Sequence, residues 1–141
     1  MTASTVPRDA DALTSLGAGM LPGHLGVRVL SYSDGEVTGE LPIRPELFAP
    51  NGFVHAAALI GLADTLCGYG CATSLPPGAS GFTTVELKTN FLAAAREGVL
   101  HCRANSVHSG RSTQLWDATV THGQDRTVAV FRCTQLILWP Q

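Results

Sequence analysis

The sequence is short of charge, since only 14% of its 141 residues are Asp, Glu, Lys or Arg, against roughly 25% in an average soluble protein. The formal net charge is −2 and the basic residues form no cluster, which excludes the positive surface that nucleic-acid binding requires. So few charges on a small chain indicate that part of its surface is covered by another subunit.

Long hydrophobic runs are also missing, because no apolar stretch approaches the roughly 20 residues of a membrane span. The first eleven residues are polar and acidic and lack the basic start and apolar stretch of a secretory signal. The cysteines are few and form no C-x-x-C pair and no Cys/His spacing typical of zinc; they are Cys67, Cys71, Cys102 and Cys133. We therefore expect a reduced, cytoplasmic protein with no metal and no membrane contact.

The length of the chain suits one domain, which we place at residues 23–141 after an N-terminal extension, residues 1–22, with a short helix over 9–16. Runs rich in β-branched and aromatic residues, separated by turn residues, predict six strands at 27–32, 36–43, 82–92, 99–108, 113–122 and 127–139. The small and apolar residues 55–73 are too many for one strand and predict a helix. Together they predict an α+β fold, an antiparallel sheet wrapped around one long central α-helix.

Asp64 is the only acidic or basic side chain in the predicted helix, apart from the histidine at its start. A carboxylate in an apolar helix is costly unless it is paired or used. Gly61 and Gly68 lie on the same face, although glycine costs a helix about 1 kcal/mol relative to alanine. We expect open space around Asp64 and a close approach of some group to the helix backbone. The alternative is a structural carboxylate beside glycines that only permit tight packing.

The segment before the helix, Pro50-Asn51-Gly52-Phe53-Val54-His55, is a turn followed by a helix start. Free N–H groups and the helix dipole at such an end favour a carbonyl oxygen that becomes an oxyanion. His55 and Asp64 are nine residues apart, or roughly 13 Å along a helix, whereas reacting groups must approach one substrate to about 3 Å. Two antiparallel helices from two subunits meet this demand, which predicts a homodimer with composite sites.

These residues resemble the hotdog-fold thioesterases of the phenylacetate-degradation type, over residues 23–138. The family pattern G-x-V-H-G-G, with an aspartate nine residues after the histidine, stands here as Gly52-Phe53-Val54-His55-Ala56-Ala57 and Asp64. Residues 84–92 resemble the family's long central strand, residues 108–111 its following turn, and Val128-Ala129 its last strand. The resemblance implies an enzyme that hydrolyses an aryl- or medium-chain acyl-CoA to free acid and CoA without a separate cofactor, as a homodimer or homotetramer.

By the same resemblance, Asp64 is the nucleophile or general base, the N–H of Ala56 polarises the thioester oxygen, and His55 helps to set the turn. Thr84, from the other subunit, orients water or the carboxylate. The residues that fall where the family contacts CoA are Gly110, Arg111 and Ser112. As alternatives, Thr84 is an ordinary strand residue and Arg111 a solvated turn residue.

Two positions depart from the family pattern. Ala56 and Ala57 replace two glycines and narrow the approach to the helix start. The family's polar residue six positions before the histidine falls on Ala49, and Asn51 is a candidate substitute or a plain turn residue.

Two other functions on this fold remain open. A CoA-ester dehydratase needs its histidine and acid closer together than His55 and Asp64 lie on one helix. A non-catalytic acyl-CoA-binding protein would suit the methyl groups of Ala56 and Ala57. Three phenylalanines are candidates either for an aryl pocket or for the core: Phe48, Phe53 and Phe82.

Overall fold

The computed structural model describes residues 6–141. The elements are, in chain order, α1 (Ala10–Leu16), α2 (Leu21–Leu25), β1 (Arg28–Ser33), β2 (Glu36–Pro42), a 3-10 turn (Pro45–Leu47), α3 (Ala56–Thr73), β3 (Gly81–Phe91), β4 (Val99–Ser109), β5 (Thr113–His122) and β6 (Arg126–Leu138). Every predicted strand and helix is present, and each end lies within one residue of its prediction.

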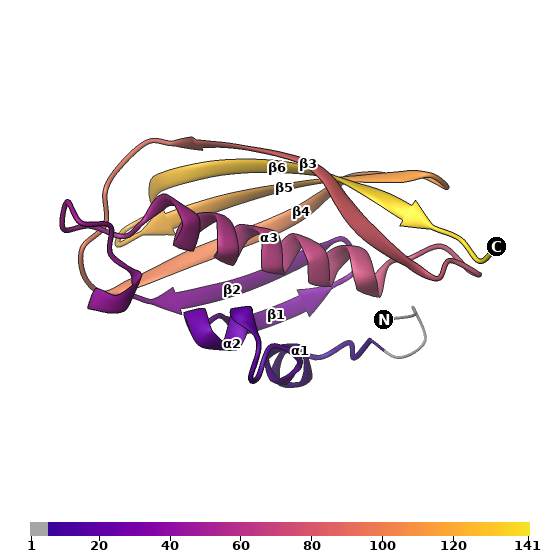
Figure 1. Cartoon of the computed structure of the whole chain (residues 1–141), viewed down its shortest axis with the longest axis horizontal. Coiled ribbons are helices and arrows are strands. Elements are labelled where there is room, and N and C mark those ends of the chain that lie inside the picture. The colour runs from indigo at the N-terminus through magenta and orange to yellow at the C-terminus, as the bar shows by residue number, and fades with distance from the viewer. Residues whose placement is uncertain (1–5) are drawn as a thin grey trace.

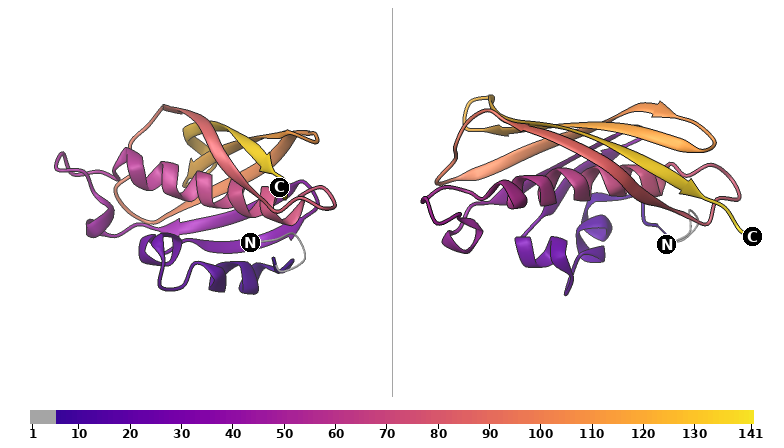
Figure 2. Two further views of the ribbon diagram at one scale, coloured as in Figure 1. Left: turned by 45° about the vertical axis from the view of Figure 1, so that its right-hand side comes forward. Right: turned by 45° about the horizontal axis from the view of Figure 1, so that its top comes forward.

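The six strands form one antiparallel sheet in the order β1-β2-β4-β5-β6-β3. The sheet curls around α3, which lies along its concave face (Figure 1 and Figure 2), and α3 contacts β2, β3, β4, β5 and β6. This confirms the predicted α+β architecture.

The position of β3 differs from the expected central strand. Within the described part of one chain, residues 6–141, β3 is an edge strand and pairs with β6 on one side only. Sequence patterns report the length and apolar character of a strand but not its neighbours, and β3 is central only where another chain continues the sheet.

The helix α3 supplies the middle of the core. Its buried residues include Leu62, Leu66 and Cys67, all fully shielded from solvent, and the four cysteines of the chain are all buried and free. By length and composition α3 could cross a membrane, but 61% of it is buried inside the protein, as expected for the core helix of a folded domain.

The sequence does not predict α2, because Gly17, Gly19 and Pro22 read as chain breaks. Pro22 instead lies in the first turn of α2, where its missing N–H has no helical partner to lose. Gly26, at φ +94°, ends α2 in the left-handed region. The guanidinium of Arg44 donates to the carbonyls of His24 and Leu25. These bonds supply donors to the last carbonyl groups of α2, which have no partner within the helix.

Candidate active site

The turn that leads into α3 is tightly closed. The N–H of Ala49 donates to the carbonyl of Phe53 at 2.8 Å, and Gly52 has a φ of +91°, a region that glycine enters without strain. Asn51 is exposed in this turn, and its side chain has no hydrogen-bond partner among residues 6–141. No described residue of the same chain therefore orients the Asn51 side chain as a substitute for the family's polar residue.

His55 caps the start of α3 with its ring. Its Nδ1 accepts the N–H of Ala57 at 2.8 Å, and its carbonyl accepts the N–H of Ala58 at 2.9 Å. Nδ1 must be unprotonated to accept, so the proton of the neutral ring lies on Nε2. The N–H of Ala56, the first residue of the helix, has no acceptor within the described part of the chain. It is therefore free to bind an oxygen that becomes negative, with the helix dipole behind it.

Asp64 lies about two turns further along α3, in a half-buried position. Its Oδ1 is buried and has no hydrogen-bond partner among the described residues. Burial raises the pKa of Asp64 above its ordinary value of 3.8, because the charged form loses hydration. A structural carboxylate would be expected to have a partner for that oxygen, so the geometry favours a carboxylate that is used in chemistry.

The glycines beside Asp64 are explained in a different way from the prediction. A Cβ at Gly61 would lie 2.5 Å from Cδ1 of Leu25 in α2, whereas a Cβ at Gly68 would make an ordinary contact of 3.6 Å with the Phe82 ring. The expected close approach is therefore the side chain of Leu25. The expectation of open space was wrong at Gly61, because the sequence did not reveal α2.

Thr84 lies on β3 and is exposed. Its hydroxyl donates to Oε1 of Gln135 at 2.8 Å, and Nε2 of Gln135 donates to Sγ of Cys133 at 3.3 Å. Since the only proton of the Thr84 hydroxyl is bonded inward, its oxygen is left to accept from water or substrate. Gln135 was missed, because the sequence does not show that this glutamine of β6 is fully buried.

The predicted CoA-binding turn is held by the C-terminal segment. The N–H of Ile137 donates to the carbonyl of Ser112 at 2.9 Å, the Trp139 ring stacks under the Arg111 guanidinium at 4.2 Å, and Trp139 Nε1 donates to the Arg111 carbonyl at 3.1 Å. Gly110 closes the hairpin by donating to the carbonyl of Thr113 at 2.9 Å. Arg111 is therefore a positioned cation and not a loose one, and Trp139 is the partner that the sequence did not reveal.

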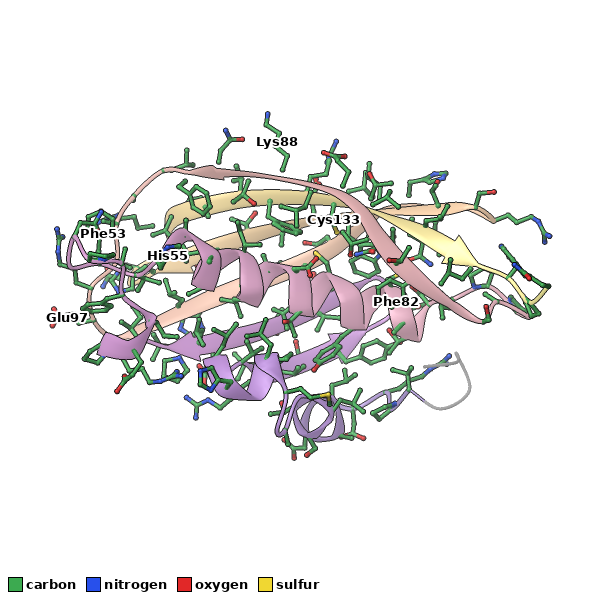
Figure 3. The ribbon with its side chains drawn as sticks, in the orientation of Figure 1. Phe53, His55, Phe82, Lys88, Glu97 and Cys133 are labelled. Atoms are coloured by element: carbon green, nitrogen blue, oxygen red, sulfur yellow. The ribbon has the colours of Figure 1, made fainter. Side chains whose placement is uncertain are left out.

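The predicted residues do not all meet within one chain. His55 and Phe53 lie at the start of α3, and Phe82 lies toward its other end (Figure 3), where the hairpin containing Arg111 also ends (Figure 1). Ala56 and Asp64 are eight residues apart, or about 12 Å along the helix. Of the three candidate phenylalanines, Phe48 and Phe82 pack against the core, whereas Phe53 lines a surface pocket that also includes Ala56.

The sequence model of the family described as the thioesterase superfamily matches residues 51–129, more than half of the chain. The chain belongs to the thioesterase superfamily. The match includes the turn before α3, the whole of α3 and most of the sheet, and it confirms the expected class of enzyme, a thioester hydrolase.

Relatives of this thioesterase cover most of its length. The 1,4-dihydroxy-2-naphthoyl-CoA hydrolase of Listeria monocytogenes is 27% identical over 110 residues, which are 78% of this chain and 89% of that protein. The enzyme of the same name from Escherichia coli is 26% identical over 131 residues, covering 91% and 93% of the two chains.

Solved structures confirm the hotdog fold. A mutant of thioesterase PA1618 from Pseudomonas aeruginosa matches with a TM-score of 0.87 at 23% identity, over 92% of this chain and 94% of that one. The PaaI protein of the Escherichia coli phenylacetic acid degradation operon matches with a TM-score of 0.74 at 23% identity, over 82% and 86%.

Proposed function

We propose that this thioesterase hydrolyses an acyl-CoA to a free acid and CoA, with Ala56 of one subunit and Asp64 of a second subunit at each site. The observation that carries the proposal is the pair of unpartnered groups on α3, the N–H of Ala56 and the buried Oδ1 of Asp64. Support comes from the two bacterial relatives named as hydrolases of an aryl acyl-CoA, which this chain matches over most of their length.

In this mechanism the thioester oxygen accepts a hydrogen bond from Ala56 and gains negative charge as its carbon is attacked. In one route the Asp64 carboxylate takes a proton from the water that adds to the carbon; the carbon–sulfur bond then breaks, the free acid forms, and this proton passes to the sulfur of CoA. In the other route the carboxylate itself adds to the carbon, the carbon–sulfur bond breaks to leave a mixed anhydride on Asp64, and CoA takes a proton from solvent. Water then hydrolyses the anhydride, which releases the free acid and restores the carboxylate. Thr84, whose oxygen is free to accept, orients the attacking water.

The edge strand β3 supports the second subunit. One chain holds Ala56 and Asp64 about 12 Å apart, too far to act on one carbonyl group. Among residues 6–141, β3 has an unpaired edge 11 residues long and exposes the apolar side chains of Val85 and Leu87. Such an edge is a surface for pairing with another strand. We propose that two copies of the chain pair there as a homodimer, alone or as half of a tetramer.

The role of Ala56 is tested by Ala56→Pro. Proline is tolerated at the first position of a helix, and His55, with φ −65° and ψ 140°, already has the extended conformation that precedes proline. The substitution therefore removes the N–H of residue 56 and keeps the helix intact. We expect kcat to fall about 10²- to 10³-fold, as for loss of one oxyanion donor, with an unchanged melting temperature. Full activity in Ala56→Pro would exclude this N–H as the donor.

The role of Asp64 is tested by Asp64→Asn, with Asp34→Asn in the β1–β2 turn as the matched control. Loss of a base or nucleophile should lower kcat at least about 10²-fold, or roughly 3 kcal/mol. The variant should fold as well as the parent or better, because an unpaired buried charge is removed. A structural Asp64 predicts the opposite, a lower melting temperature with turnover retained in the folded fraction.

Mixing the two inactive variants tests the composite site. If each site takes Ala56 from one subunit and Asp64 from the other, a mixed dimer of Ala56→Pro and Asp64→Asn chains contains one intact site. Random exchange should then restore about a quarter of parental activity. No recovery, with subunit exchange demonstrated, would place both groups in one subunit.

A panel of acyl-CoAs, assayed for released thiol, enoyl hydration and binding, separates the esterase from a dehydratase and from a binding protein.

A further inference from the structure

A pocket of about 320 Å³ opens beside the start of α3. One wall comes from the turn and the first turns of the helix, and the other from the end of β3 and the segment after it; the lining residues are Phe53, Val54, Ala56, Leu59, Phe91, Leu92, Ala93 and Ala94. The two walls are joined by a hydrogen bond from the N–H of Val54 to the carbonyl of Ala95 at 3.0 Å. The pocket is therefore part of the folded chain and not a gap between mobile loops.

The position of the pocket ties it to the proposed chemistry. Ala56, whose N–H has no acceptor among residues 6–141, is one of the lining residues. A thioester whose oxygen binds that N–H extends two arms from its carbonyl carbon, the acyl group and the pantetheine chain of CoA. Because Ala56 also lines the pocket, we expect one of these two arms to lie against it.

The chemistry of the lining decides between the two arms. No lining side chain can donate or accept a hydrogen bond, and the pantetheine chain carries two amide groups that lose free energy when buried without partners. An apolar acyl group has no such groups. At about 320 Å³ the pocket is at the small end of ligand sites and suits a group about the size of one or two rings.

Two aromatic side chains give the pocket a preference within apolar groups. The guanidinium of Arg96 lies 5.5 Å from the centroid of the Phe53 ring, a contact that restrains the ring. Phe91 is 44% exposed, so its ring is open to contact. Ring–ring contacts add to the binding of an aryl ligand beyond the area that it buries, by roughly two- to tenfold in affinity.

We propose that this pocket is the acyl subsite, and that Phe53 and Phe91 select an aryl acyl group over a straight chain of equal carbon number. The inference rests on the proposed function for the position of the thioester, but its ligand preference can be measured without turnover.

The experiment compares the parent with Phe53→Leu and Phe91→Leu, which keep apolar volume and remove the ring. The control is Leu30→Ala, an apolar residue that is 50% exposed on the opposite edge strand, β1. The readout is the ratio of kcat/KM for benzoyl-CoA to that for heptanoyl-CoA, which have equal carbon numbers. We expect each phenylalanine variant to lower this ratio roughly two- to tenfold and the control to leave it unchanged.

Binding of uncleavable thioethers separates failure of the inference from failure of the proposed function. S-phenacyl-CoA and S-(2-oxooctyl)-CoA carry the same two kinds of acyl group at equal carbon number. Suppose that the parent protein hydrolyses no acyl-CoA, and that it still binds the phenacyl compound preferentially in a way that depends on Phe53 and Phe91. The acyl subsite then stands, and the proposed function fails. Unchanged ratios in folded variants would overturn the subsite. So would dissociation of the dimer in Phe91→Leu with equal loss for both acyl groups, because the pocket would then be a subunit contact.

Discussion

The two ends of α3 are built differently although they belong to one continuous helix. At the C-terminal end the Trp116 ring packs against Gly70, and its Nε1 donates to Oε1 of Gln114 at 2.8 Å. Gln114 in turn donates to the carbonyl of Ser74 at 3.0 Å, and the Thr73 hydroxyl donates to the carbonyl of Tyr69 at 2.9 Å. The buried side-chain groups described at this end are therefore hydrogen-bonded.

The N-terminal half of α3, from Ala56 to Asp64, keeps groups without partners. The N–H of Ala56 has no acceptor among residues 6–141, and Oδ1 of Asp64 is buried without a hydrogen bond in the same part of the chain. A buried atom without a partner, such as Oδ1 of Asp64, costs about 1–3 kcal/mol, and a fold retains such an atom where chemistry needs it. The comparison indicates that the C-terminal end holds the helix in the sheet, and that the N-terminal half leaves groups free for a ligand.

The strongest test of the packed end is Gly70→Ala, with Gly61→Ala as its matched control. A Cβ at Gly70 collides with the rigid Trp116 ring, whereas a Cβ at Gly61 meets the flexible end of Leu25. Overpacking costs about 1–3 kcal/mol, and alanine returns up to about 1 kcal/mol of helix propensity. We expect Gly70→Ala to lower the free energy of unfolding by about 1–2 kcal/mol and Gly61→Ala to change it little. Urea denaturation measures both, and equal losses would contradict the difference in packing.

Arg111 sharpens the comparison, because it is a candidate ligand group at the packed end. Arg111→Ala removes a cation that Trp139 holds in place, so KM for an acyl-CoA should rise about tenfold, or 1.4 kcal/mol, with kcat nearly unchanged. An N-acetylcysteamine thioester, which lacks the nucleotide, should show no such rise. An unchanged KM for acyl-CoA, or an equal rise for both substrates, would remove Arg111 from the CoA site.

His55 tests whether the N-terminal end depends on its cap. His55→Ala leaves the N–H of Ala57 without the acceptor that it now has at 2.8 Å, so the free energy of unfolding should fall by about 1 kcal/mol. His55→Asn keeps a side-chain acceptor and should retain most of that stability. Thermal unfolding of the two variants decides the point, and equal losses would show that the ring contributes by packing and not by capping.

The pKa of Asp64, raised by burial from 3.8, predicts opposite pH trends for activity and stability. Activity needs the carboxylate, so kcat/KM should begin to fall at a higher pH than for an ordinary aspartate. Between 3.8 and the raised value the folded state binds a proton that the unfolded state does not, so the contribution of Asp64 to stability improves as pH falls through that window. Asp64→Asn should lack this component in a plot of melting temperature against pH, and identical plots would exclude a raised pKa.

Much of the fold follows from local patterns in the sequence. The turn residues between strands and the small apolar run of α3 are enough to locate every predicted element to within one residue, because these signals act over a few positions. The helix α2 was missed, since Pro22 is read as a break although the first turn of a helix accepts it. The edge position of β3 was also missed, because strand order depends on contacts between distant segments.

The candidate site was predictable in its residues but not in its contacts. The isolated charge of Asp64 and the turn before His55 are visible in the sequence, and the unpartnered atoms at Ala56 and Asp64 agree with them. The side chains that hold or fill the site come from elsewhere in the chain: Leu25, Phe91, Gln135 and Trp139. No local pattern assigns such partners, because they meet only when the sheet has closed.

The place of α3 in the chain has a consequence for synthesis. The helix is long and apolar enough to pass for a membrane span, and four of the strands that cover it, β3 to β6, come after it. The end of β6 leaves the ribosome about 65 residues later than Thr73, or roughly 3–13 s at usual rates of translation. Through that interval the nascent chain presents an uncovered apolar helix, a target for chaperones and for aggregation. We therefore expect yield in a cell to depend on how fast the last strands are made, in addition to how stable the finished fold is.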